Sequence, residues 1–253
     1  DALTGCLNRR ALDERLLASP ALALGQCREV TMKMADCAVQ ALRGSLLSVT
    51  DYTPALAEQV RADEEATDHY EDILGTYLVK LSSQTLTAAD SENATELLKV
   101  IGDFERIADH AVNIVESAEE LQSKGLTLSE AAQADLKVLD AAVEEILDRS
   151  ADAFRRGDAQ AAAAVEPLEQ VVDLLKEQLR TRHILRMREG KCSIEAGFVW
   201  ADLLTDLERT SDHCSNIAGC VIDAAQHDLN LHETLHNVRH SDGDYRRRFN
   251  AYA

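Results

Sequence analysis

The chain has 253 residues, enough for one large or two small domains, and its 45 acidic and 26 basic side chains give a formal net charge of −19. This charge disfavours nucleic acid and anionic lipid as direct ligands and suits cations. Only 3 Pro and 11 Gly, with 4% aromatic residues, argue against a sheet protein and for long helices. No apolar run is long enough to cross a membrane.

Residues 1–20 are expected to be a linker or lead-in segment, extended up to the helix-start signal Ser19-Pro20. Residues 1–16 resemble the opening of a GGDEF-type diguanylate cyclase. The Gly-Gly-Asp/Glu-Glu-Phe turn that defines that class is absent from the sequence, so coincidence, a linker and a fusion remnant stay open. The lack of an initial Met and of a signal peptide favours a piece of a longer protein.

The rest of the chain divides into long amphipathic stretches punctuated by Pro, Gly and capping residues. Helices are expected at about residues 21–48, 54–83, 91–124, 129–157, 158–190 and 193–226. The polar, basic tail after residue 226 is expected to hold one short helix and a fraying end.

A motif of twelve residues in the third expected helix recurs in the sixth. Asp-Phe-Glu-Arg-Ile-Ala-Asp-His-Ala-Val-Asn-Ile at 103–114 becomes Asp-Leu-Glu-Arg-Thr-Ser-Asp-His-Cys-Ser-Asn-Ile at 206–217, with seven of twelve positions identical and an offset of 206 − 103 = 103 residues. A period of this size indicates a duplicated domain. We therefore predict an all-α protein of two repeated three-helix bundles, residues 21–125 and 126–226, packed into one body and followed by a tail at 227–253.

Each repeat also carries two Glu-xxx-Asp pairs, one on its second helix and one on its third. A spacing of four places both carboxylates on one helix face, where a bundle normally buries aliphatic groups. Carboxylates cannot stay ionised there without a compensating cation. Two facing pairs supply four carboxylates, an oxygen-rich site for iron, zinc, manganese or magnesium. The candidate metal ligands are Glu64, Asp68, Glu105 and Asp109 in the first repeat, and Glu169, Asp173, Glu208 and Asp212 in the second.

Ordinary ion pairing is the alternative explanation of these carboxylates. Arg106 and Arg209 directly follow the third-helix and sixth-helix Glu residues, and could neutralise them without a metal. The pair on the fifth helix continues into Lys176 and Arg180, which is also the pattern of an exposed charged stripe.

The histidines do not indicate an enzyme. His110 and His213 adjoin the Asp of each motif about 100° off the acidic face, so a supporting or surface role is expected. A terminal polar face explains His232, His236 and His240 as well as metal binding does. The Glu-xx-His signature of ferritin-type di-iron proteins is absent from the sequence, as are a phosphate-binding Gly-rich loop and a nucleophilic triad.

With these motifs, residues 20–226 resemble the PhoU family of phosphate-uptake regulators. The third-helix and sixth-helix motifs, Glu105-Arg-Ile-Ala-Asp109-His and Glu208-Arg-Thr-Ser-Asp212-His, match the family's metal-binding pattern well, and the pairs at Glu64 and Glu169 match more loosely. Residues 12–24 are similar to the junction that precedes such a domain in bacterial sodium-dependent phosphate cotransporters.

The resemblance implies a non-catalytic, metal-binding regulatory domain at the cytoplasmic face of the inner membrane. Its partner would be the transporter portion of the same chain, or a separate phosphate transporter or sensor, with no nucleic acid; the oligomeric state stays open. Two other functions remain: a free-standing phosphate-signalling regulator, and a metal-free helical adaptor whose acidic faces meet a basic partner.

Overall fold

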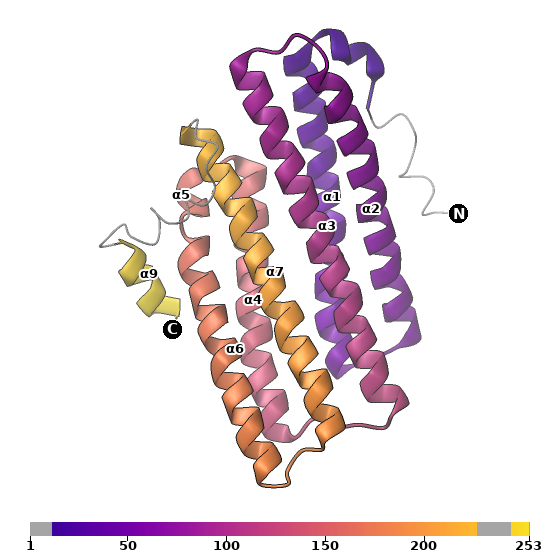
Figure 1. The fold of residues 1–253 in the computed structure, drawn as a ribbon, viewed down its shortest axis with the longest axis vertical. Helices are drawn as coiled ribbons and strands as arrows, with labels where there is room; N and C mark the ends of the chain where they lie inside the picture. Colours follow the sequence, from indigo (N-terminus) through magenta and orange to yellow (C-terminus); the bar gives the residue numbers. More distant parts are fainter. Residues whose placement is uncertain (1–11, 227–243, 253) are drawn as a thin grey trace.

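The computed structural model describes residues 12–226 and 244–252, and every regular element in those ranges is a helix. The helices form two antiparallel bundles that lie side by side with their long axes close to parallel (Figure 1). The expected all-α class, the two repeats and their packing into one body are confirmed. No helix among the described residues has both the length and the apolar character needed to span a membrane.

Each bundle is built from three long helices. The first contains α1 (Pro20–Thr50), α2 (Pro54–Ser82) and α3 (Ala88–Ser123), preceded by the 3-10 helix η1 (Glu14–Ala18). The second contains α4 (Glu130–Arg156), the short α5 (Ala159–Ala162), α6 (Val165–Arg188) and α7 (Ile194–Gln226). Near the C-terminus, α9 (Asp244–Tyr252) packs against α6.

Local chemistry sets the helix ends. At the start of α2, α3, α4 and α5, a side-chain oxygen accepts a hydrogen bond from a free backbone N–H group of the first turn; the acceptors are Thr53, Thr87, Ser129 and Asp158. Glycines with φ of 62°, 62° and 69° follow α3, α4 and α6, at Gly125, Gly157 and Gly190. A side chain with a Cβ adopts this left-handed conformation at a cost, which explains glycine at these stops.

Three sequence expectations were wrong in detail. The chain before Ser19 forms η1 rather than an extended segment, because the Asp13 carboxylate accepts the N–H of Arg15 and caps it. α3 begins at Ala88, capped by Thr87, rather than at about residue 91. The predicted fifth helix is split into α5 and α6, since the ring of Pro167 conflicts with a helical carbonyl four residues earlier, at Ala163.

One continuous apolar core joins the two bundles. The motif helices α3 and α7 pack directly against each other at the centre of the molecule (Figure 1). Phe104 of α3 meets Phe154 of α4 edge to face, with ring centroids 5.7 Å apart. Trp200 of α7 is 1% exposed and lies in this core. This packing fixes the positions of α3 and α7, and therefore of the motif side chains.

Candidate metal centre

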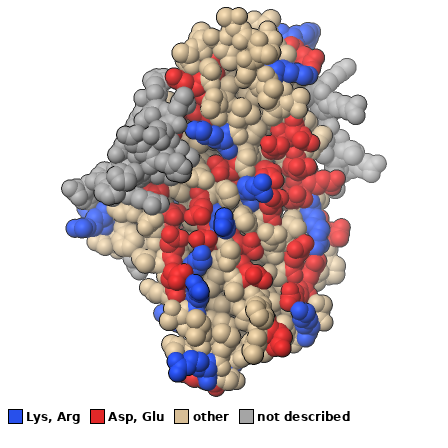
Figure 2. All heavy atoms as spheres, viewed as in Figure 1, with Lys and Arg blue, Asp and Glu red and all other residues tan. Residues whose placement is uncertain are grey.

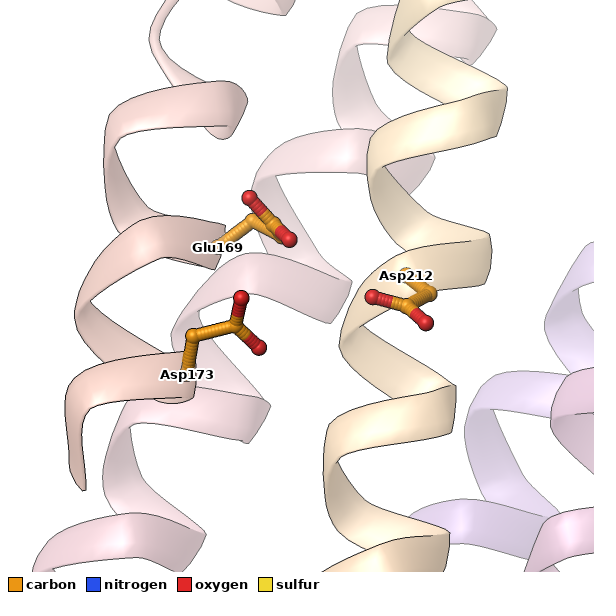
Figure 3. Close-up of side chains that lie close together, drawn as sticks. All are labelled: Glu169, Asp173 and Asp212. Atoms are coloured by element: carbon orange, nitrogen blue, oxygen red, sulfur yellow. The ribbon is translucent and has the colours of Figure 1, made fainter. Parts of the chain in front are cut away.

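Three carboxylates converge in the second repeat. Glu169 and Asp173 project from successive turns of α6 toward Asp212 on α7 (Figure 3), and one oxygen of each lies within 4.8 Å of the others. Within residues 12–226 and 244–252, this is the one group of at least three His, Cys, Asp or Glu side chains that meets this distance. Glu169 is only 4% exposed. Three carboxylates held this close form a donor set for a hard or borderline cation.

The environment of the cluster disfavours its negative charge. Burial raises the pKa of Asp212, and the nearby Glu208 and Asp173 raise it further, whereas His213 and Arg209 act in the opposite direction. A cation at the centre would relieve this repulsion.

The fourth predicted ligand of this site is held apart by an internal cation. Glu208 Oε1 lies 2.8 Å from Nζ of Lys176, and both side chains are about four-fifths buried. The exposed charged stripe that was considered for this helix is therefore interrupted on α6, because Lys176 is largely buried. Arg180, one turn later, is exposed. The second repeat presents three carboxylates and one carboxylate–ammonium pair.

The first repeat brings its four predicted ligands into one region without so tight a cluster. Burial raises the pKa of Glu64, with smaller contributions from Asp109 and Asp68. Burial and Asp109 likewise raise the pKa of Glu105. Arg106 contacts both third-helix carboxylates, with Nη1 3.0 Å from Asp109 Oδ2 and Nε 3.4 Å from Glu105 Oε2. The ion-pairing alternative is thus present here, on an exposed arginine.

Charges flanking the two sites differ between the repeats, and the sequence analysis missed this. The offset that relates Glu64 to Glu169, 169 − 64 = 105, also relates Glu71 to Lys176 and Arg61 to Glu166. Arg61 pairs with Glu119 at 2.8 Å, whereas Glu166, 2% exposed, accepts a hydrogen bond of 2.5 Å from Ser215 Oγ. Aligning the repeats at this offset would have revealed both exchanges.

The first Asp and the His of each motif form a contact between the repeats. Nδ1 of His110 lies 2.9 Å from Asp206 Oδ1, and Nδ1 of His213 lies 2.9 Å from Asp103 Oδ1. The two imidazole centroids are 5.7 Å apart. Both histidines therefore contact an aspartate of the opposite repeat, a partner that was not predicted, and their supporting role at the acidic sites stays a prediction. His232, His236 and His240 lie outside the described residues.

A comparison with protein families finds the same division into two repeats. The PhoU domain model matches residues 31–118 and 137–221, one stretch in each repeat. This chain belongs to the PhoU family. Both matched stretches lie inside the predicted repeats 21–125 and 126–226, whose outer limits stay a prediction.

Relatives of two lengths match the chain. It is 25% identical over 219 residues to a phosphate-specific transport system accessory protein PhoU homolog of Pseudomonas aeruginosa, covering 85% of this chain and 89% of that protein. It is 24% identical over 228 residues to the putative inorganic phosphate export protein YjbB of Escherichia coli strain K12, covering 88% of this chain but 41% of that protein.

Solved structures confirm the fold. The crystal structure of PhoU from Pseudomonas aeruginosa superposes with a TM-score of 0.76 at 24% identity, over 81% of this chain and 97% of that one. The phosphate transport system regulatory protein PhoU from Streptococcus pneumoniae gives 0.72 at 18% identity, over 83% and 99%.

Proposed function

We propose that this chain is a non-catalytic regulator of phosphate transport that works beside a transporter or its sensor at the cytoplasmic face of the membrane. The observation that carries the proposal is the PhoU match in both repeats. A relative named as a phosphate-specific transport system accessory protein supports it, because the match covers 89% of that protein. The carboxylates of the second repeat lie on the long helices α6 and α7, an arrangement that suits the binding of an ion or a partner.

The free-standing regulator, an alternative in the sequence analysis, is now favoured over a cotransporter domain. The match to the accessory protein spans most of both chains, whereas it spans less than half of the export protein. The cotransporter assignment, with a transporter portion in the same chain, rests on the resemblance of residues 12–24 and remains the competing proposal.

Metal binding is part of the proposal. The three convergent oxygens of Glu169, Asp173 and Asp212 fit iron, zinc, manganese or magnesium. The raised pKa of Asp212 reflects its burial first and its carboxylate neighbours second, and a bound ion would offset both effects. The bound ion would supply positive charge that holds α6 to α7. In the first repeat, Glu64, Asp68, Glu105 and Asp109 would close on an ion only after Arg106 moves aside.

A metal-free adaptor is the second candidate. Arg106 and Lys176 already neutralise part of each site. Acidic side chains gather in patches across the middle of the face in Figure 2, with basic ones scattered among them and uncharged residues over the rest. A basic partner segment could meet this surface by charge complementarity.

The test is phosphate uptake in cells that lack the gene for this chain. Uptake should lose its dependence on external phosphate, and the wild-type chain should restore it. Restoration by the wild type but not by Asp173→Asn/Asp212→Asn would support the metal-binding regulator. Restoration by both, with metal lost from the variant, would support the adaptor; phosphate uptake indifferent to the gene would overturn the regulatory role.

A further inference from the structure

A cavity of about 410 Å³ opens between the two repeats, and none of the eight candidate metal ligands lines it. Its walls come from α1, α3, the end of α4 and the end of α7, so both bundles contribute. The cavity has a buried apolar floor, where Leu24, Leu97, Val100, Phe154 and Val221 are each at most 7% exposed, and an exposed rim that includes Ala21, Ala224 and Ala225. This volume lies in the range of small-molecule sites.

Two charged side chains in the wall differ in their partners. Arg28 is engaged, because Nη2 donates to the Phe154 carbonyl and its guanidinium lies 4.7 Å from the centroid of the Phe154 ring. Glu96 is 9% exposed, and no hydrogen bond or ion pair within the described part of the chain reaches its carboxyl group. A buried carboxyl group without such a partner calls for a proton or a ligand.

The charge around Glu96 favours a cation over an anion. The lining holds Asp90 and Glu96 against Arg28, a formal balance of −1. Burial, together with the negative charge of the buried Asp223, raises the pKa of Glu96 to about 7 against the opposing charges of Lys99 and Arg28. A positive group beside Glu96 would replace the proton that the carboxyl group otherwise takes up.

We propose that this cavity binds a small organic cation, with its amine paired to Glu96 and its apolar body against Leu97, Val100 and Phe154. The site goes beyond the proposed function and does not depend on it. Because its walls come from both repeats, the ligand would stabilise their packing and act as an effector of the molecule.

The test is a titration of the full chain followed by NMR chemical shifts at pH 8, with hexylammonium as the probe. n-Hexanol and hexanoate, which have the same chain length without the positive charge, serve as comparison probes. Glu96→Gln should weaken hexylammonium binding about tenfold or more and leave n-hexanol binding nearly unchanged. Gly25→Leu should block every probe, since a Cβ at Gly25 meets no atom within 4 Å and the new side chain would enter the cavity.

Gly102→Leu is the matched control, because Gly102 also has open space at its Cβ and does not line the cavity. It should bind all probes as the wild type does. Hexylammonium binding that survives Glu96→Gln, equal or tighter binding of hexanoate or n-hexanol, or no binding of hexylammonium at millimolar concentration would each overturn the proposal. None of these results bears on phosphate regulation, which is tested separately in cells.

Discussion

His110 of the first repeat and Asp206 of the second are joined at 2.9 Å, and the duplicated motif makes the same contact in reverse, between His213 and Asp103 at 2.9 Å. Each aspartate also accepts from an asparagine of the opposite repeat, Asn113 or Asn216, at 3.2 Å. One motif thus serves two purposes: its Glu and Asp four apart face the acidic sites, and its first Asp, His and Asn fasten the bundles together.

The crossed pairs should contribute to stability. His110→Ala should lower the free energy of unfolding by about 1–2 kcal/mol, because Asp206 loses a charge-assisted hydrogen bond in a largely buried contact. Chemical denaturation measures the change. His69→Ala on α2, for which the described structure gives no hydrogen bond or ion pair, is the control and should stay within about 0.5 kcal/mol of wild type. Equal effects of the two variants would contradict this role of His110.

Lys176 should limit the affinity of the second site for cations. Lys176→Met removes a positive charge 2.8 Å from Glu208 in a largely buried pair, so divalent-ion affinity should rise at least about fivefold, the ~1 kcal/mol that two unit charges about 4 Å apart exchange even at the screening of bulk water. Isothermal titration calorimetry measures it. Lys124→Met, which removes an exposed pair with Glu120, should change little. Unaltered affinity in Lys176→Met would show that its ammonium group is not a competitor.

The exchange of charges between the repeats suggests a reciprocal experiment. Glu71→Lys places in the first repeat the residue type that the second carries at Lys176. The new ammonium group should weaken cation binding at the first site, because Glu71 contributes to the raised pKa of Glu105 and is therefore close to it. Isothermal titration calorimetry should show weaker cation binding at the first site and unchanged binding at the second. A matching loss at both sites would indicate one shared site.

Glu96 should make stability depend on pH. Its folded pKa is about 7 against an ordinary 4.5, so the native state binds more protons between these values. This contribution to stability is complete below about pH 4.5 and is lost as the pH rises through 7. Glu96→Gln should therefore raise the melting temperature at pH 8, by about 2–4 °C for each kcal/mol of relief, and change it little at pH 5. A wild-type-like melting curve at pH 8 would contradict this assignment.

Much of the architecture could be predicted from the sequence because local signals agreed. The helix stops at Gly125, Gly157 and Gly190 and the caps at Ser129 and Asp158 all act where the pattern placed them. The break before α6 was missed because a run of alanines hid the effect of Pro167 on the preceding turn.

The site was predictable only in outline. Spacing placed Glu169 and Asp173 on one face, but which carboxylates meet depends on the packing of α6 on α7. That packing buries Glu169 and lets Lys176 reach Glu208, an interhelical contact that no local pattern encodes. The partners of His110 and His213 were hidden for the same reason, since they lie in the other repeat.

The central claim is that Glu169, Asp173 and Asp212 form a cation site. Equilibrium dialysis of chelator-treated protein against Mn²⁺, Zn²⁺, Fe²⁺ and Mg²⁺ in turn tests it most directly. The triple variant Glu169→Gln/Asp173→Asn/Asp212→Asn is compared with a control that removes three exposed carboxylates elsewhere, Glu29→Gln/Glu116→Gln/Asp202→Asn. For at least one metal, the wild type and the control should bind the same number of ions and the triple variant at least one fewer. Equal binding by all three proteins for every metal would contradict the claim.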